Sequence, residues 1–463
     1  MKLFDTLARE RREFIPTDPK EVTIYSCGPT VYSYAHIGNM RTYIFMDLLR
    51  RVLKRNGYKL KHVMNITDVG HLVSDADEGE DKLQKAASEQ HKSPYEIAEF
   101  YTGLFFKDLR ELNIETPEIV AKVTDYIDEM IDFVKILQEK GFAYEISDGI
   151  YFDISKFKDY GKLSGLNLEE QLAGARVGVN NEKRNPEDFA LWKKAPKEHI
   201  MQWPSPWGMG YPGWHIECST LEKIYFGDML DIHTGGVDHI PIHHENEIAQ
   251  SEAYFGKKTV NYWVHAEFLL VNGGKMGKSL GNLYTIDTLK EKGYTPLAYR
   301  YFCLNGNYRA KLNFTWDGLK SAQVSLNRLY ELALAHKNGS DDDNRELIKT
   351  WKTEFNEAIN DDLNIPLALG TVWKAARHNV KSKDIYDFLI WADEVLGLKL
   401  DEAEEFLKEE PDELEPELID LIEKRDKAKL EKNYALADSI RDELKNRGII
   451  LTDTREGTRW ERI

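Results

Sequence analysis

Residues 20–67 carry the pattern of a strand, a helix and a second strand. The first strand, at residues 22–26, is rich in β-forming side chains. The apolar side chains that follow recur at helical spacing, and a second strand then ends at Thr67. This βαβ pattern predicts a parallel sheet with a right-handed crossover. Ligands of such sheets bind at the carboxyl ends of the strands, where Cys27 and residues 65–68 fall.

The chain is long enough to hold more than one packed core. Its 463 residues, of which 42% are hydrophobic and 30% charged, suit a soluble globular protein of roughly three domains. Its cysteines, Cys27, Cys218 and Cys303, are too few for a disulfide framework and favour a reducing compartment. No stretch has the apolar length of a signal peptide or a membrane-spanning helix. We therefore expect a cytoplasmic protein with no membrane partner.

The net charge of −17 argues against unspecific binding to nucleic acid. Residues 424–463 differ from the rest, because they hold eleven Lys and Arg against eight Asp and Glu. This segment is the expected place for a contact with RNA. A solvated helix face would give the same count.

Patterns between residues 94 and 210 indicate two helices, a hairpin and an insertion. Apolar side chains recur at helical spacing in residues 94–113 and 124–141. Residues 144–152 read as a hairpin around an Asp-Gly turn. Residues 154–210 combine Gly, Pro, Lys and Trp without a clean period, so we interpret them as an insertion into the sheet domain.

Strand character returns at residues 228–233 and 260–264, with a helix from about residue 243 between them. From Asp317 onward nearly all of the sequence reads as helical, and residues 409–416 read as a linker to a last module. The predicted fold class is α/β. It comprises a Rossmann-like parallel-sheet domain with an insertion, followed by an all-α helical bundle and a small C-terminal module.

A cluster of metal-ligand residue types lies in the middle of the chain, since seven of the thirteen histidines fall within residues 199–265. His243 and Glu247 are four residues apart and would share one face of a helix. Together with Cys218 and Cys27 they form a donor set that zinc accepts. The segment lacks the His-Glu-x-x-His pattern of zinc peptidases.

A plainer interpretation of the same residues stays open on spacing alone. Cys27 and Cys218 would be small buried apolar residues, and His243 would pack or cap a helix. His244 would point about 100° away from the face that His243 and Glu247 share.

Two further motifs suit phosphate groups. Lys275 and Lys278 lie three apart in the Gly-rich segment Lys-Met-Gly-Lys-Ser, where they could neutralise a polyphosphate. His36 lies at the expected start of a helix, where backbone N–H groups favour anions. An ordinary basic loop and a structural histidine are the competing interpretations.

The order of these motifs carries a family resemblance. His-Ile-Gly-Asn at residues 36–39 and Lys-Met-Gly-Lys-Ser at 275–279 resemble the two signature motifs of class I aminoacyl-tRNA synthetases. The whole set resembles the cysteinyl-tRNA synthetase family, and its other members are residues 27–32, 65–68, 213–218, 231–236, 243–247, 361–366, 437–442 and 457–460.

The resemblance implies an organisation and an activity. The implied domains are the first half of a catalytic domain at 1–120, a connective insertion at 121–210, the second half of the catalytic domain at 211–260, a stem-contact region at 261–316, a helical bundle at 317–408 and an anticodon-binding module at 416–463. The implied reaction activates L-cysteine with ATP and transfers it to tRNA(Cys), with one zinc ion, with magnesium accompanying ATP, and in a monomer.

The resemblance also implies roles for individual residues. The implied zinc ligands are Cys27, Cys218, His243 and Glu247. The implied catalytic residues are His36, Asn39, Lys275 and Lys278. The implied ATP-binding residues are Gly38, Asp238 and Lys278, and the implied amino-acid pocket contains Thr67, Trp214 and His233.

Departures from the family pattern and two alternatives remain. Asn39 replaces a usual His, which is a variant that the family tolerates. Gly277 replaces a usual Ser, so one hydroxyl contact near the phosphates is missing and the rate of activation stays open. One alternative is a zinc-dependent ligase that joins cysteine to an amino-sugar, although such an enzyme has no use for an anticodon-binding module. The other is a catalytically silent tRNA-binding protein, which the retained lysines and metal donors disfavour. The tRNA bases read and the role of Cys303 are not determined by the sequence, and core packing is our expectation for Cys303.

Overall fold

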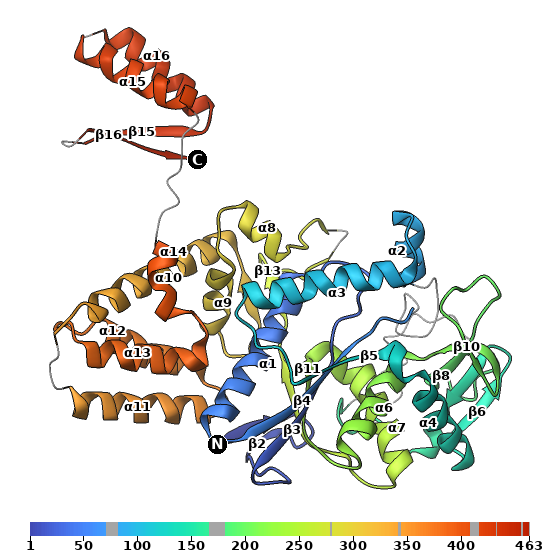
Figure 1. The fold of residues 1–463 in the computed structure, drawn as a ribbon. Helices are drawn as coiled ribbons and strands as arrows, with labels where there is room; N and C mark the ends of the chain where they lie inside the picture. Colours follow the sequence, from blue (N-terminus) through green and yellow to red (C-terminus); the bar gives the residue numbers. More distant parts are fainter. Residues whose placement is uncertain are drawn as a thin grey trace. The chain divides into compact units, whose positions relative to one another are not determined.

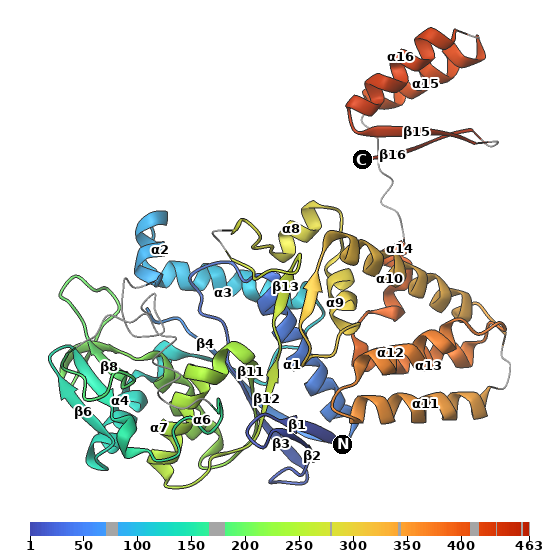
Figure 2. The ribbon, with the colours of Figure 1, turned by 180° about the vertical axis from the view of Figure 1, so that it is seen from behind.

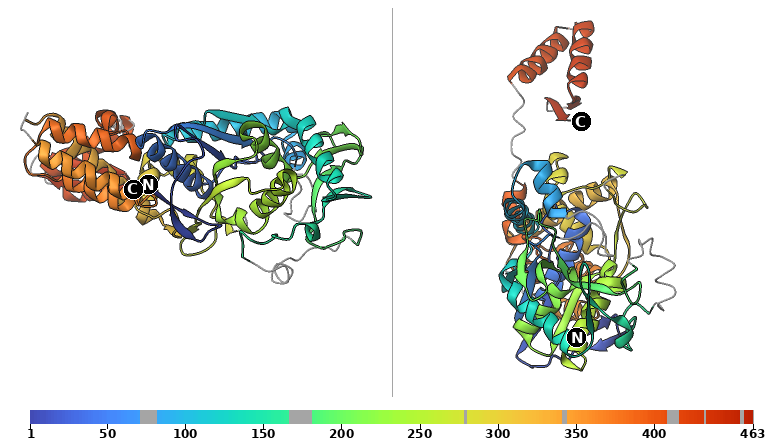
Figure 3. Two further views of the ribbon diagram at one scale, coloured as in Figure 1. Left: turned by 90° about the horizontal axis from the view of Figure 1, so that it is seen from below. Right: turned by 90° about the vertical axis from the view of Figure 1, so that its right-hand side faces the viewer.

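The computed structural model describes residues 1–70, 82–165, 181–277, 280–340, 344–407, 416–431, 433–454 and 457–462. The chain forms two compact units, Met1–Ala403 and Glu404–Ile463. Within the first unit, the helical bundle and the antiparallel sheet lie at opposite ends of a central parallel sheet (Figures 1 and 3). In the described residues, no helix is both long and apolar enough to cross a membrane.

The central sheet has five parallel strands in the order β12-β11-β3-β4-β5. Its strands are β3 (Glu21–Ser26), β4 (Lys59–Ile66), β5 (Ile119–Lys122), β11 (Leu230–Gly236) and β12 (Val260–Ala266). The predicted βαβ unit is confirmed, because α1 (Ile37–Arg55) connects the neighbouring strands β3 and β4. A hairpin of β1 (Lys2–Asp5) and β2 (Glu10–Glu13) adjoins this sheet through contacts of β1 with β12.

The chain between β4 and β11 contains a second, antiparallel sheet in the order β6-β7-β8-β10-β9. Its strands are β6 (Ala143–Ile146), β7 (Gly149–Phe152), β8 (Phe189–Lys194), β9 (Trp203–Ser205) and β10 (Gly208–Pro212). The predicted hairpin is β6 and β7. Strands β8, β9 and β10 occupy the stretch in which the sequence had no period. Phe133, Phe152 and Trp192 form part of the core beneath this sheet.

The helices of the first unit pack around these sheets. Helix α4 contacts both α6 and α7 (Figure 2). The helices before the bundle are α2 (Lys82–Gln90), α3 (Pro94–Glu111), α4 (Ile127–Glu139), α6 (Trp214–Phe226), α7 (Glu245–Phe255), α8 (Ile286–Glu291) and α9 (Pro296–Leu304). Short helical turns are η1 (Val123–Tyr126), η2 (Ile154–Lys156), η3 (Val237–His239), η6 (Leu400–Glu402) and the π-helical η4 (Ile240–His244).

The bundle contains α10 (Trp316–Lys337), α11 (Arg345–Asn360), α12 (Ile365–Ala376) and α13 (Lys383–Leu396), followed by α14 (Ala403–Leu407). A short parallel pair, β13 (Leu269–Val271) and β14 (Leu312–Phe314), precedes it. The second unit holds α15 (Pro416–Leu430) and α16 (Tyr434–Asn446). It also holds an antiparallel hairpin of β15 (Ile449–Thr454) and β16 (Gly457–Arg462), where the sequence had indicated helix.

A buried ion pair ties helix α1 to α9, and the same arginine also contacts α13 of the bundle. Arg300 of α9 is fully buried, and its Nη2 donates to Oδ2 of Asp47 on α1 at 2.5 Å. The other guanidinium nitrogens donate to main-chain oxygens of Leu396, Leu112 and Asn113. Burial by itself would raise the pKa of Asp47, but Arg300 and Arg51 outweigh burial and lower it below the usual range.

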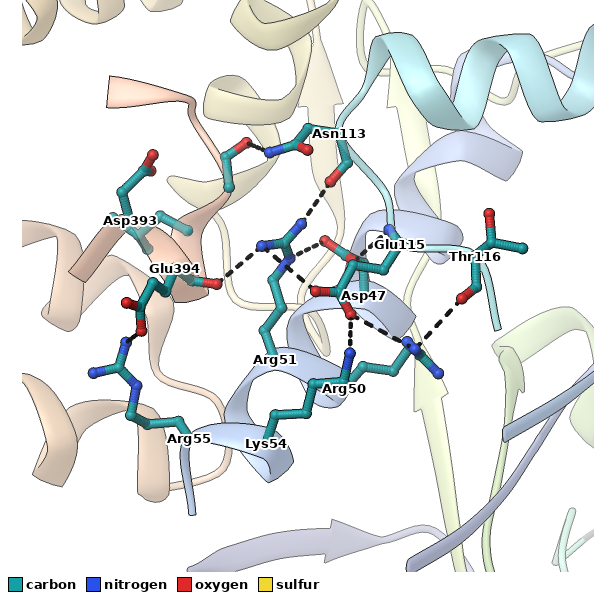
Figure 4. Close-up of polar contacts among 12 residues, drawn as sticks. Asp47, Arg50, Arg51, Lys54, Arg55, Asn113, Glu115, Thr116, Asp393 and Glu394 are labelled. Atoms are coloured by element: carbon teal, nitrogen blue, oxygen red, sulfur yellow. Dashed lines mark hydrogen bonds and ion pairs between the residues drawn. The ribbon is translucent and has the colours of Figure 1, made fainter. Parts of the chain in front are cut away.

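The last turns of α1 add further arginine contacts (Figure 4). Arg51 donates to Asp47 Oδ2 at 2.8 Å and to the main-chain oxygen of Glu394 at 2.9 Å. Arg55 donates to Oε2 of Glu394 at 2.8 Å, and its guanidinium lies 4.0 Å from the ring centre of Trp391. The carboxyl end of α13 is therefore held against the helix that begins at His36.

Replacement of Asp47 tests this linkage. We expect Asp47→Asn to lower the free energy of unfolding by about 3–5 kcal/mol at neutral pH, because it leaves the buried Arg300 without its anion. The difference from the unsubstituted protein should shrink as the pH falls through the lowered pKa of Asp47, since the carboxylate then becomes neutral in both states. Urea unfolding from pH 7 down to about pH 1, which extends below the ordinary carboxyl pKa, measures both effects.

The control is an ion pair exposed to solvent. Lys374 and Glu354 lie 2.9 Å apart on the bundle surface, with 57% and 38% of their side chains exposed. We expect Glu354→Gln to cost less than about 1 kcal/mol, because exposed pairs are screened by water. Equal losses for the two variants would contradict the role given to Asp47.

Candidate metal centre and active site

A cavity of about 460 Å³ opens at the carboxyl ends of the parallel strands. Residues at or just after the carboxyl ends of β3, β4, β11 and β12 contribute to its wall, among them Gly28, Asn65 and Glu267. Position 28 requires glycine because the main chain of β4 passes close to it. A Cβ at this position would lie 1.6 Å from the main-chain oxygen of Asn65. The expectation that ligands bind at this edge of the sheet therefore corresponds to a real cavity.

One end of the cavity holds four buried metal-donor side chains. Cys27 follows β3, Cys218 lies on α6, His243 lies in η4 and Glu247 lies in the first turn of α7. Their ligand atoms all lie within 4.8 Å of one another. The Cys218 Sγ to His243 Nε2 distance is 3.6 Å, and the Cys27 Sγ to Glu247 Oε1 distance is 3.9 Å.

The spacing of this first donor set fits a tetrahedral ion. Zinc bound to sulfur, nitrogen and oxygen at 2.0–2.3 Å has ligand-to-ligand edges of roughly 3.3–3.8 Å. The two sulfur contacts are close to that range. His243 Nε2 and Glu247 Oε1 are closer, at 2.7 Å, so an ion would replace this direct contact. Two thiol groups in one set favour a soft metal such as zinc over magnesium or calcium.

A second donor set shares Cys27 and Glu247 with the first. It adds His233 of β11 and His244, and its ligand atoms also lie within 4.8 Å of one another. The two sets differ in access. Cys27, Cys218 and His243 line the cavity, whereas His233 and His244 are not among the described lining residues. An ion in the first set would therefore meet whatever enters the cavity.

The proximity of these groups changes their acidity. Burial by itself would raise the pKa of Cys27, but the hydrogen bond with Cys218 and the fields of His244 and His243 lower it well below its usual range. Burial, together with the hydrogen bond and charge of Cys27, raises the pKa of Cys218. Burial also opposes the charged form of His243, but Glu247 and Cys27 raise its pKa to about 10. The site thus favours a thiolate at Cys27.

A layer of polar side chains behind the donors was not predicted from the sequence. His215 Nδ1 lies 2.9 Å from Nδ1 of His243, and Glu222 Oε1 lies 2.6 Å from Nδ1 of His233. Such partners orient the rings of metal-binding histidines. His215 and Glu222 both lie on α6, whereas the rings that they contact lie on η4 and β11. The crowding of histidines in residues 199–265 was the signal for this layer in the sequence.

His244 begins a further chain of contacts. Its Nε2 lies 3.3 Å from Sγ of Cys27, and its Nδ1 lies 2.8 Å from Nε2 of His265. His265 Nδ1 in turn lies 2.7 Å from the hydroxyl of Thr6. Helical spacing predicts that His244 points away from the face of His243. In the structure the His244 ring nevertheless lies against Cys27, which belongs to the first donor set.

The other end of the cavity begins with the first turn of α1. His36 Nδ1 accepts a hydrogen bond from the main-chain N–H of Asn39, whose Oδ1 accepts one from the N–H of His36. This reciprocal cap fixes both side chains at the helix start. Gly38 has no side chain, and a Cβ there would lie 3.0 Å from the His36 ring and from Met276. Burial lowers the pKa of His36, and Asp238 offsets part of that effect.

The remaining predicted nucleotide residues fall in two places. Asp238 in η3 and Lys275 after β13 both line the cavity. Lys275 follows a tight turn in which Asn272 and Gly273 have φ values of 49° and 77°. Lys278 lies outside the described residues.

Of the three residues predicted for the amino-acid pocket, one lines the cavity and two are buried behind it. Trp214 lines the cavity and stacks on His243, with ring centres 4.2 Å apart. Thr67 is buried and donates from its hydroxyl to Glu217 Oε2 at 2.6 Å. His233 is fully buried and stacks on Trp263 at 4.3 Å. Neither Thr67 nor His233 is among the described residues that line the cavity.

Known sequences match this chain over its whole length or nearly so. The sequence family described as tRNA synthetases class I (C) catalytic domain matches residues 13–324. The cysteine–tRNA ligase of Treponema denticola is 45% identical, and the match covers 100% of each chain. The cysteine–tRNA ligase 1 of Burkholderia lata is 45% identical over 99% of this chain and 96% of its own. The cysteine–tRNA ligase of Thermococcus gammatolerans is 43% identical over 100% and 99%.

Comparison with solved structures supports the fold. The methionyl-tRNA synthetase of Mycobacterium tuberculosis, in its crystal structure with methionyl-adenylate, has a TM-score of 0.59 and 13% identity to this chain. The match covers 85% of this chain and 95% of that one. The Rossmann-like fold class is thereby confirmed. On the full-length sequence matches, the chain belongs to the cysteine–tRNA ligase family of class I aminoacyl-tRNA synthetases.

Proposed function

We propose that the protein is a cysteine–tRNA ligase. It activates L-cysteine with ATP to cysteinyl-adenylate and pyrophosphate, and then transfers cysteine to the 3′ end of tRNA(Cys). The observation that carries this proposal is the position of the first donor set. Cys27, Cys218 and His243 of this set line the same cavity as His36 and Asp238. An amino acid with a metal-binding side chain and a nucleotide would meet in this space.

Cys27, Cys218, His243 and Glu247 would hold a single zinc ion. When bound, the ion supplies a site for a thiolate that the hydroxyl of serine satisfies poorly. The chain needs such a device, because an apolar pocket alone separates small side chains only weakly. Trp214, which stacks on His243, would close one wall around the substrate. Thr67 and His233 would act through Glu217 and Glu222, behind that wall.

The activation step would take place at the nucleotide end. The carboxylate of cysteine attacks the α-phosphorus of ATP, a new oxygen–phosphorus bond forms, and magnesium pyrophosphate leaves. His36, Lys275 and Lys278 would stabilise the charge that develops on the phosphates. Asn39 holds the cap that orients His36, the bare Gly38 leaves room for the base, and Asp238 would bind the ribose.

The transfer step would require tRNA(Cys) to reach the same cavity. The second unit is the proposed anticodon-binding module, since residues 424–463 carry an excess of basic side chains on an otherwise acidic chain. The other domain roles follow the same family plan, with the connective insertion at 121–210 and the stem-contact region at 261–316. We propose that the protein acts as a monomer.

A paired assay tests the proposed function against its two alternatives. We expect cysteine-dependent ATP–pyrophosphate exchange, followed by cysteine transfer to tRNA(Cys). Transfer to an amino-sugar but not to tRNA would identify the amino-sugar ligase instead. Absence of exchange in metal-replete protein would leave only the silent tRNA-binding alternative.

The metal site is tested by a conservative change. We expect Cys218→Ser to lower the zinc content of the purified protein from about one per chain to near zero, because a thiolate donor is lost. Exchange with cysteine should fall with it. Cys303→Ser is the matched control, since Cys303 is buried on α9 and burial raises its pKa to about 11. Metal analysis that finds equal zinc in the two variants would refute the donor assignment.

The basic loop is tested separately from the metal. We expect Lys278→Ala to slow exchange by roughly 100-fold or more, while zinc content is unchanged, because one preorganised cation is lost at the developing charge. Lys311→Ala is the control, since Lys311 is exposed and lies outside the cavity wall. A near-normal exchange rate in the Lys278 variant would remove its role with phosphate.

A further inference from the structure

The cavity has an aromatic side that the activation chemistry does not use. Tyr34, Tyr43, Tyr101 and Phe105 all belong to its wall. Tyr34 lies in the segment between β3 and α1, Tyr43 lies on α1, and Tyr101 and Phe105 lie on α3. They come from other parts of the chain than Cys218, His243 and Lys275, and they form a cluster of aromatic rings in the wall of the cavity.

Tyr34 is the exposed member of this group. Its relative exposure is 55%, against 7% for Tyr101 and 2% for Phe105. The Tyr34 ring meets Tyr101 edge to face, with centres 5.2 Å apart and planes at 83°. Tyr101 is itself held, because its hydroxyl accepts a hydrogen bond from Gln90 Nε2 at 3.1 Å. Tyr34 is thus a supported aromatic ring with much of its surface open.

The position of Tyr34 along the chain matters for what could stack on it. It lies between Cys27, at the metal end, and His36, at the phosphate end. In a cysteinyl-adenylate the carboxyl carbon lies between the thiol and the α-phosphate. Tyr34 therefore lies on the segment that connects Cys27 to His36, and its ring lines the same cavity as both of them.

We propose that Tyr34 is a stacking platform for the 3′-terminal adenine of tRNA during cysteine transfer. The terminal ribose is then placed beside the carboxyl carbon. Its hydroxyl oxygen forms the new ester bond, the bond from that carbon to the phosphate oxygen breaks, and AMP leaves with the electron pair. The hydroxyl proton is taken up by the departing phosphate. Base–aromatic stacking of this kind suits an entering single-stranded end.

This inference rests on the proposed function and adds a subsite to it. The other flat ligand in the reaction is the adenine of ATP. In the proposed function, that base and its ribose are received by other lining residues, namely Gly38, which lies next to Met276, and Asp238. Tyr34 would then be free to receive the second adenine.

The first experiment observes stacking directly. It uses tRNA(Cys) that carries fluorescent 2-aminopurine as its terminal base, and full-length protein saturated with a non-hydrolysable cysteinyl-adenylate analogue. We expect binding to quench the fluorescence, Tyr34→Phe to keep the quenching, and Tyr34→Ala to lose it. Tyr95→Ala is the matched control. Tyr95 is exposed, as Tyr34 is, but it lies on α3 and is not among the described residues that line the cavity. Undiminished quenching in Tyr34→Ala would overturn the proposal.

The second experiment compares the two half-reactions. We expect Tyr34→Ala to slow transfer from preformed adenylate roughly tenfold more than it slows exchange, as the loss of one base–aromatic stack predicts. Tyr34→Phe should restore the ratio. A raised KM for ATP in exchange, with transfer lowered only in proportion, would assign Tyr34 to the adenine of ATP instead. Loss of exchange in the unsubstituted protein would point to a failure of the proposed function itself.

Discussion

The carboxyl end of strand β3 is the point on which the site depends. Cys27 follows this strand and is buried among the side chains of the two candidate donor sets, and nine residues later His36 caps α1 at the wall of the same cavity. Because the neighbouring strands β4 and β11 are parallel to β3, their ends also reach this edge. The parallel register therefore brings side chains from distant parts of the sequence to one cavity.

Helix α1 connects this edge to the rest of the first unit. Its first turn holds His36 and Asn39 in a reciprocal cap, and its middle and last turns bind α9 and α13 through Asp47, Arg51 and Arg55. The buried pair of Asp47 and Arg300 has a high desolvation cost, which the main-chain contacts of Arg300 offset. The position of the His36 cap is thus coupled structurally to the packing of the bundle.

Much of this arrangement could be predicted from the sequence, but not all of it. The parallel sheet follows from residues 20–67, because strand and helix periods are distinct there. His243 and Glu247 share a helix face, as their spacing predicts, and their atoms are 2.7 Å apart. Strands β8 to β10 could not be predicted, since the packing of Trp192 and Phe189 in a core, rather than a local period, stabilises them. The terminal hairpin was missed for a similar reason.

The candidate metal site could be predicted from the sequence only in part, for a different reason. Spacing alone left Cys27 and Cys218 open as small core residues, and only a folded chain brings their sulfurs to one place. The most direct test of the account replaces zinc with cobalt and records the sulfur-to-cobalt absorption band. The account predicts that L-cysteine strengthens and shifts this band, whereas L-serine leaves it unchanged. An identical spectrum with and without L-cysteine, at concentrations that saturate exchange, would contradict selection of the substrate through its thiolate.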